Sequence, residues 1–405
     1  MFARTLAAAG LAAALGAGGA WTQEPPPAED LPPEDFVIMP WGGSPSDPDT
    51  LREIRACGFN LAGFITPDGV EAVAQAGLKC IVIDGRVSEA AANPEMADAE
   101  VENRLNAVAG PLKGHPAVFG YYLRDEPNAS LFPNLARCAS MLNKMQPEVT
   151  PYINLYPNYA SAKQLGTDTY EAYLEAFVSA VHPTYISYDH YALMADGSLR
   201  DSYFQNLEAV RNAALRHGIP FWNIILSNSH FHYAEPSPAG FRFQVYTTLA
   251  YGARGVCYFT YLTPRHGNYR LGPIDQFGHK TATWDMVRDV NLQIRALAPT
   301  YLTLTSVNVF HHPGVPEGCT GIATSKHLKS VSGKQLLVGE FEGPKGQPFV
   351  MVVNTDLHHS TPFDVEFKGQ GGIFCTSAYT GATGAWGGEG KWLAPGQGML
   401  LSLRP

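Results

Sequence analysis

Several features that mark common protein classes are scarce or missing in this sequence of 405 residues. Only 16% of the residues are charged, no stretch is strongly basic, and the net charge is −9. Such a charge balance is poorly suited to binding nucleic acid or an anionic membrane surface. The six cysteines contain no C-x-x-C pair, and no G-x-G-x-x-G motif follows a predicted strand. We therefore expect no cofactor, no metal and no nucleic acid partner.

The N-terminus has the composition of a secretory signal. Arg4 precedes a short apolar run from Leu6 to Leu15, and small residues follow at Gly18, Gly19 and Ala20. This run is too short to remain in a bilayer as a spanning helix. We expect residues 1–20 to be removed, the proline-rich residues 21–35 to form an extended linker, and the mature protein to be secreted or periplasmic without membrane insertion.

Export would permit disulfide bonds, but the cysteine positions favour free thiols. Cys80 and Cys257 lie inside apolar runs, where a thiol behaves as a small hydrophobic group. If a bridge exists, Cys319 and Cys375 form the pair to test first.

Short apolar runs alternate with longer helical patterns from residue 36 to residue 299. This alternation is typical of repeated strand–helix units around a parallel sheet, and eight such units predict a (β/α)8 TIM barrel. An open, doubly wound sheet is the alternative. The expected strands are Phe36–Pro40, Asn60–Phe64, Leu78–Asp84, Ala117–Arg124, Thr150–Leu155, Tyr185–Tyr191, Phe221–Leu226 and Gly255–Tyr261.

After Pro299 the pattern changes to short alternating strands separated by glycine and proline clusters. Residues 300–405 are therefore predicted to form a small antiparallel β-sandwich.

The segment Gly120–Pro127 is the most informative part of the chain. Its apolar and aromatic residues end at Asp125 and Glu126, which a proline follows directly. Because proline interrupts strand pairing, the two acids are expected at the carboxyl end of the fourth strand. That end of a barrel carries the chemistry, and paired carboxylates there suggest general acid/base catalysis of the kind used in glycoside hydrolysis.

Strand periodicity selects the catalytic pair. Glu126 shares one face of the fourth strand with Arg124, and Asp189 shares one face of the sixth strand with Tyr191. If both faces point to the barrel axis, Glu126 and Asp189 oppose each other, one protonated and one ionised. Asp125 then lies on the opposite face and orients loops, although a shift of one residue would exchange its place with that of Glu126.

The remaining strand ends supply aromatic rings, amides and carboxylates of the kinds that bind sugars. Asp84 fits equally well as a substrate contact or as an anchor for the loop that follows it. His230 and His232 could ligate a metal together with Asp84 or Asp189, but the first strand ends in Trp41 and glycines, without the His-x-His pair of metal-hydrolase barrels. The candidate substrate contacts are Trp41, Asp84, Asp125, Asn154, Tyr156, His190, Tyr191, Asn228, His230, His232 and Tyr261.

These segments resemble the β-galactosidase-type barrels of the clan-A glycosidases. Gly120–Pro127 is similar to their fourth strand, 241–261 to their seventh helix and eighth strand, and Val352–Asn354 with Ala394–Gly398 to the sandwich that follows. The resemblance implies a retaining glycosidase in which Glu126, the carboxylate before proline, is the acid/base.

One departure from that family leaves the mechanism open. The family places its nucleophilic glutamate at the end of the seventh strand, but Pro220–His230 contains no acid. Asp189 is the best substitute, and its role could be exchanged with that of Glu126, because some α-glycosidase barrels carry the nucleophile on the fourth strand and the acid on the sixth. The leading hypothesis is a secreted glycoside hydrolase. A non-catalytic carbohydrate-binding barrel and, third, a metal-dependent hydrolase are the alternatives.

Overall fold

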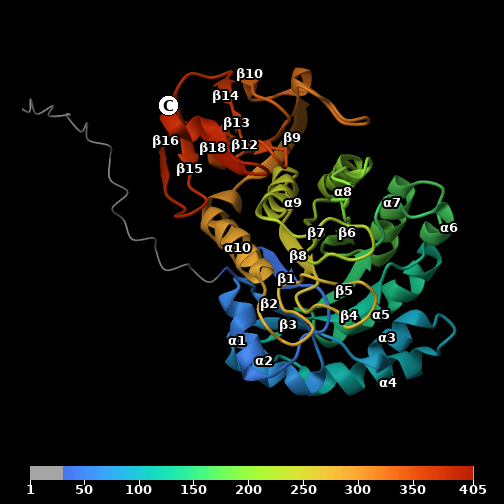
Figure 1. The fold of residues 1–405 in the computed structure, drawn as a ribbon. Coiled ribbons are helices and arrows are strands. Elements are labelled where there is room, and N and C mark those ends of the chain that lie inside the picture. The colour runs from blue at the N-terminus through green and yellow to red at the C-terminus, as the bar shows by residue number, and fades with distance from the viewer. Residues whose placement is uncertain (1–30, 405) are drawn as a thin grey trace, which may run out of the picture.

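The computed structural model describes residues 31–404, so the expected signal segment and most of the expected linker lie outside the described residues. The described chain consists of an eight-stranded parallel barrel surrounded by helices and a C-terminal region of antiparallel sheets (Figure 1). This architecture confirms the predicted TIM barrel with a β-rich C-terminal domain.

The barrel strands agree with the predicted ones to within two residues at each end. They are β1 (Val37–Pro40), β2 (Leu61–Ile65), β3 (Lys79–Val82), β4 (Val118–Asp125), β5 (Thr150–Leu155), β6 (Ile186–Asp189), β7 (Phe221–Leu226) and β8 (Gly255–Phe259). The helices are α1 (Pro48–Ala56), α2 (Val70–Gln75), α3 (Gly85–Ala92), α4 (Asp98–Ala109), α5 (Phe132–Met145), α6 (Ala162–Leu165), α7 (Tyr170–Val181), α8 (Tyr203–His217), α9 (Pro238–Ala250) and α10 (Ala282–Tyr301).

Asn60 joins the two ends of the strand order. The strands pair in parallel in the order β1-β8-β7-β6-β5-β4-β3-β2. Between β1 and β2, the backbone N–H of Asn60 donates to the carbonyl of Ile38 (3.1 Å), and the side-chain oxygen of Asn60 accepts from the N–H of Ile38 (2.8 Å). A side chain thus supplies a hydrogen bond that regular strand pairing would otherwise make, and it leaves no free edge there.

Large rings fill the interior of the barrel. Phe64, Phe119, Tyr152, Tyr185 and Trp222 belong to one buried cluster, in which the rings of Tyr185 and Trp222 stack at 4.0 Å. These side chains make the interior a packed core, so solvent and ligands reach the barrel only at its ends.

The C-terminal region has its own small core between two layers. A six-stranded antiparallel sheet in the order β16-β15-β18-β12-β11-β9 lies opposite two short two-stranded sheets, β10-β14 and β13-β17. The strands are β9 (Thr305–His312), β10 (Leu328–Ser332), β11 (Leu336–Glu342), β12 (Pro348–Asn354), β13 (Thr361–Pro362), β14 (Asp364–Phe367), β15 (Gly372–Thr376), β16 (Thr383–Ala385), β17 (Trp392–Leu393) and β18 (Gly398–Arg404).

Helix α9 lies between the barrel and the six-stranded sheet (Figure 1). From Phe243 to Ala250 every residue of this helix is buried. On its sheet side, Gly339 of β11 comes so close that a Cβ at this position would collide with the carbonyl oxygen of Ala250. On its barrel side, the amide of Gln244 accepts from the N–H of Leu226 (3.0 Å) and donates to the carbonyl of the same residue (3.2 Å) at the end of β7. The helix therefore couples the C-terminal sheet to the barrel mouth.

Two further observations bear on the expectations from sequence. All six cysteines are thiols, including Cys319 and Cys375, so the bridge named for testing is absent from the described structure. None of the helices within residues 31–404 has the length and apolar character needed to cross a membrane.

We predict that Gly339→Ala destabilises the protein by about 1–3 kcal/mol, because the added methyl group overpacks the contact with α9. Gly314→Ala is the matched control, since nothing lies within 4 Å of a Cβ there and the backbone is unstrained. Denaturant unfolding of both variants measures the difference, and equal stability of the two would contradict the close packing of sheet and helix.

Candidate active site

Both acids at the end of β4 belong to the barrel mouth. The pairing of β4 with β5 shifts by one residue between Tyr122 and Arg124, which is a β-bulge. After the bulge, the side chain of Asp125 contacts Asn154 of β5, and Glu126 follows with a positive φ of 45° while its N–H donates to the carbonyl of Asn154 (2.8 Å). The prediction that Asp125 lies on the opposite face is therefore wrong, because strict alternation does not hold through the bulge.

Asn154 connects the acid of β4 to the acid of β6. Its Nδ2 donates to Oδ1 of Asp125 (3.0 Å) and to Oδ1 of Asp189 (2.9 Å). Its Oδ1 accepts from Oγ of Ser187 (3.0 Å). All three bonds fix the orientation of this buried amide, so the residue predicted as a substrate contact instead positions two carboxylates.

A chain of hydrogen bonds extends behind this bridge across the barrel. The hydroxyl of Tyr152 lies 3.1 Å from Oγ of Ser187, and Nε1 of Trp41 donates to the same hydroxyl (3.0 Å). The chain runs from the end of β1 to β6, and it holds the carboxylates on a rigid support rather than on loops.

The three carboxyl groups have raised pKa values. Burial is the largest cause for Asp189, which is 6% exposed, and the charges of Glu126 and Asp125 raise its pKa further, to well above its ordinary value. Burial and then the charge of Asp125 raise the pKa of Glu126 to about 7. Burial also raises the pKa of Asp125, against the hydrogen bond from Asn154. Each of these shifts favours the protonated form of the carboxyl group relative to an isolated acid in water.

Aromatic side chains at the strand ends include Trp41, Tyr156 and Tyr191, the rings predicted as substrate contacts. The ring of Trp41 contacts Phe259 at 5.6 Å, and the ring of Tyr191 lies at the same distance from Phe259. Burial raises the pKa of Tyr156, and the charges of Glu126 and Asp125 raise it further.

His190 and His230 are buried at the mouth, and burial holds both imidazoles neutral. Burial lowers the pKa of His190 to about 3 and that of His230 to about 4. His190 packs beside Tyr159 (5.0 Å between ring centroids). Nδ1 of His230 lies 3.0 Å from Oδ1 of Asn228, whose Nδ2 donates to the carbonyl of Phe259 (2.9 Å). These polar groups are therefore held in one arrangement.

Three predicted site residues lie elsewhere. Asp84 caps α3, accepting from the N–H of Arg86 (2.9 Å) and pairing with its guanidinium, which lowers the pKa of Asp84. Tyr261 is 2% exposed and packs outside the barrel wall, where its hydroxyl accepts from Nε1 of Trp284 (3.0 Å). His232 is exposed.

The positions of the two histidines also bear on the metal hypothesis. The ring of His230 is buried against the mouth, whereas the ring of His232 is exposed, so the two do not converge. Within residues 31–404 no group of three or more histidine, cysteine or acidic side chains has the arrangement of a metal site.

The sequence prediction missed an arginine at the mouth. Arg200, in the loop after β6, lies with its guanidinium 4.3 Å above the ring of Tyr159 and donates from Nε to the carbonyl of Tyr191 (3.2 Å). Both Arg200 and Tyr159 come from irregular loops, where sequence spacing gives no side-chain direction.

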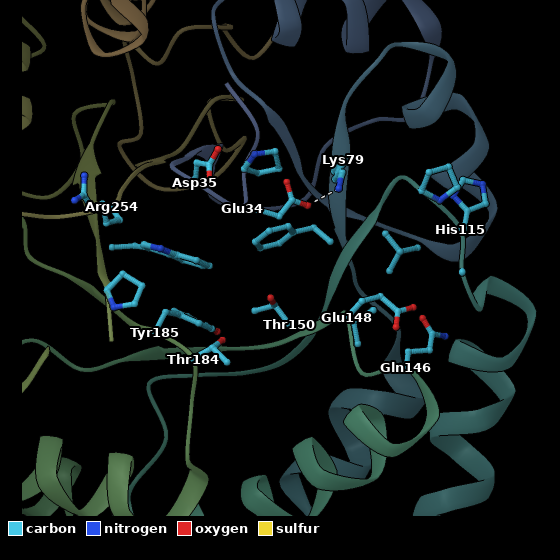
Figure 2. Close-up of a pocket in the computed structure, with 18 of the residues that line it drawn as sticks. Glu34, Asp35, Lys79, His115, Gln146, Glu148, Thr150, Thr184, Tyr185 and Arg254 are labelled. Atoms are coloured by element: carbon cyan, nitrogen blue, oxygen red, sulfur yellow. Dashed lines mark hydrogen bonds and ion pairs between the residues drawn. The ribbon is translucent and has the colours of Figure 1, made fainter. Parts of the chain in front are cut away.

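A separate cavity of about 770 Å³ opens at the other end of the barrel, where the strands begin (Figure 2). Among its lining residues Glu34 pairs with Lys79, and the guanidinium of Arg254 donates to the backbone carbonyls of Tyr301 and Leu304. These groups are engaged in holding the structure together. The N-terminal face of such barrels contributes to stability, whereas chemistry takes place at the carboxyl ends of the strands.

Solved structures with the same fold are glycoside hydrolases. A GH42 β-galactosidase from G. stearothermophilus superposes with a TM-score of 0.61 at 8% identity, over 92% of this chain and 98% of the other. A family 5 glycoside hydrolase from Bacteroides vulgatus gives 0.56 at 12% identity, over 91% and 88%. A β-galactosidase from the psychrophilic Marinomonas ef1 gives 0.52 at 10% identity, over 67% of this chain and only 62% of its own length.

Neither a protein-family model nor a curated protein matches the sequence. At such low identity the structural likeness establishes a shared fold, that of the β-galactosidase-type barrels with a sheet-rich C-terminal region.

We predict that Asp189→Asn stabilises the fold more at pH 8 than at pH 4, because the neutral amide removes the cost of a buried negative charge. The folded pKa of Asp189 lies above the unfolded one, so the cost of its charge appears as pH rises above about 4 and is absent at lower pH. Urea unfolding at pH 4, 6 and 8 measures this dependence.

Asp84→Asn is the control for this experiment, and its effect has the opposite sign. The folded pKa of Asp84 is lowered, so its contribution stabilises the fold at neutral pH and disappears as pH falls through the folded pKa. An Asp189→Asn effect that did not change with pH would contradict the assignment of a buried, repelled charge.

Proposed function

We propose that the protein is a glycoside hydrolase that cleaves O-glycosidic bonds of an oligo- or polysaccharide with Glu126 and Asp189. The observation that carries the proposal is the cluster of three carboxyl groups at the carboxyl ends of β4 and β6. Asp189 is buried, Asp125 and Glu126 are partly buried, and the Asn154 amide bonds both Asp125 and Asp189. The shared fold with β-galactosidases and other glycoside hydrolases supports the same class of reaction.

Glu126 takes the role of general acid. It is partly exposed, so a leaving-group oxygen can approach it, and its pKa of about 7 keeps it partly protonated near neutral pH. It also directly precedes Pro127, as does the acid/base of the glycosidases that this segment resembles. Its carboxyl proton passes to the glycosidic oxygen as the bond to the sugar breaks, and the carboxylate formed can then accept a proton from water.

Asp189 takes the second role, as nucleophile or as base toward water. Burial and the charges of Glu126 and Asp125 raise the pKa of Asp189, and the hydrogen bond from Asn154 opposes this shift by favouring the ionised form. Proton exchange within this pair lets one carboxyl be neutral while the other is charged, which is the arrangement both mechanisms of glycoside hydrolysis require.

A second candidate function follows from the end of β7. The residues after this strand are Ser227, Asn228, Ser229 and His230, so the family's usual acid is replaced there by neutral groups. A barrel that binds a glycan without cleaving it is the function that this replacement favours.

We predict that Glu126→Gln and Asp189→Asn each reduce hydrolysis by about 100-fold or more, the scale of a lost acid or base. Wild type, both variants and Asp84→Asn as a control are assayed on a panel that begins with β-galactosides, with reducing ends measured. Glu126→Gln should retain more activity on aryl glycosides with acidic leaving groups, which need no proton, whereas Asp189→Asn should not.

The panel also separates the two candidate functions. Full activity of Glu126→Gln would exclude the proposed acid. A wild-type protein that binds a glycan but releases no sugar from it, with the same affinity in Glu126→Gln, would favour the binding barrel.

We also propose export with cleavage after about residue 20, which the sequence of the N-terminus supports. Expression of the full chain in a bacterial host followed by mass spectrometry of the secreted or periplasmic fraction is expected to give a mature protein that lacks the first 20 residues or so. Recovery of an uncleaved chain from the cytoplasm would contradict it.

A further inference from the structure

The loops that follow β7 and β8 are joined at the barrel mouth. Ser229 and Arg270 exchange two backbone hydrogen bonds of 2.9 Å, and the guanidinium of Arg270 pairs with Glu235 at 3.1 Å. Next to this junction, the side chain of Asn268 accepts from the N–H of Phe231 (2.7 Å) and donates to its carbonyl (3.0 Å). The two loops therefore form one surface, with Phe231 fixed at its outer side.

Phe231 has an unfavourable backbone conformation, and its apolar side chain is exposed to solvent. Its φ is 46°, a region that bulky residues rarely occupy, and its side chain is 66% exposed. A strained backbone persists only where surrounding contacts impose it, and such positions cluster at sites that hold ligands. Here the two hydrogen bonds between the Asn268 amide and the backbone of Phe231 impose the conformation. The ring remains exposed, so its burial does not offset the strain.

The exposed ring continues an aromatic series that begins at the carboxyl cluster. Phe259, which contacts Tyr191 inside the mouth, lies 5.7 Å from the ring of His230, and His230 lies 4.8 Å from the ring of Phe231. Tyr269 stacks on His230 at 4.5 Å with an interplanar angle of 13°. The series thus links the exposed ring of Phe231 to Phe259 and Tyr191 through His230.

We propose that Phe231, positioned by Asn268, is the aromatic ring on which a sugar stacks in a distal subsite. The substrate is then a glycan chain of several units that extends from the carboxyl groups across the joined loops. Sugar rings present flat C–H faces that pack on an aromatic ring, while their hydroxyl groups remain available to the polar groups beside it, such as the Asn268 side chain. The inference rests on the proposed function and specifies its substrate as oligomeric.

The test compares chain-length dependence in three variants. With oligosaccharides of increasing length and a short aryl glycoside of the same sugar, Phe231→Ala is expected to lower kcat/KM by roughly tenfold on the longest substrates, which corresponds to about 1.4 kcal/mol. It is expected to leave the aryl glycoside unchanged. Asn268→Ala, which releases the backbone of Phe231, should act in the same direction, and Phe231→Trp should preserve the preference for long chains.

Phe277→Ala is the matched control, because Phe277 is 83% exposed on the loop after β8 and its only recorded ring contact among the described residues is with His279. Equal effects of Phe231→Ala and Phe277→Ala, or equal loss on short and long substrates, would overturn the subsite while leaving the proposed function intact.

If the wild type hydrolyses nothing, electrophoresis in glycan-containing gels tests the subsite by binding alone. Weaker retardation of Phe231→Ala than of wild type then supports the subsite without the enzyme, and equal or absent retardation rejects it. Thermal unfolding establishes that each variant is folded.

Discussion

Repulsion among three neighbouring carboxyl groups is the constraint around which the barrel mouth is built. Asp189 is buried and Asp125 and Glu126 are partly buried, and burial together with the neighbouring negative charges raises the pKa values of Glu126 and Asp189. The Asn154 amide provides both of its N–H groups to two of them, and the hydroxyls behind it hold that amide in place. The neighbouring histidines are kept neutral by burial and do not compensate the charge. The surroundings of the site therefore favour the protonated forms of these carboxyl groups.

The carboxyl groups stay close together only if the strands that carry them are rigid, and the packing of the barrel makes them so. Stacked rings such as Tyr185 and Trp222 fill the interior of the barrel, so the strands that carry the acids are held in fixed positions. Helix α9 fixes the end of β7 through Gln244, and the loops above β7 and β8 are tied to each other. Stability gained in the core offsets the cost of the strained and charged groups at the mouth.

The sequence predicts those parts of the molecule that depend on periodic patterns. Apolar runs located all eight barrel strands, and Pro127 located the end of β4 with its acids. It did not predict the bulge in β4 that brings Asp125 into the mouth, because a bulge depends on pairing with the neighbouring strand. The sequence left Asp84 open between a substrate contact and an anchor for the next loop, and the structure shows it capping α3. The position of Tyr261 outside the wall was not predicted, because a strand-end position does not reveal on which side of the wall a side chain packs. The bridging role of Asn154 and the place of Arg200 arise from contacts between residues far apart in the chain.

The burial of α9 on all sides has a consequence for synthesis. The helix is made directly before β8, the strand that must pair with β1 to close the barrel, and long before β11 and β18 are available to cover its outer side. A nascent chain in which the barrel has formed thus still exposes an apolar side of this helix. The C-terminal sheet is translated after the barrel and covers the outer side of α9. Folding of this sheet therefore removes an apolar surface through which the chain could aggregate.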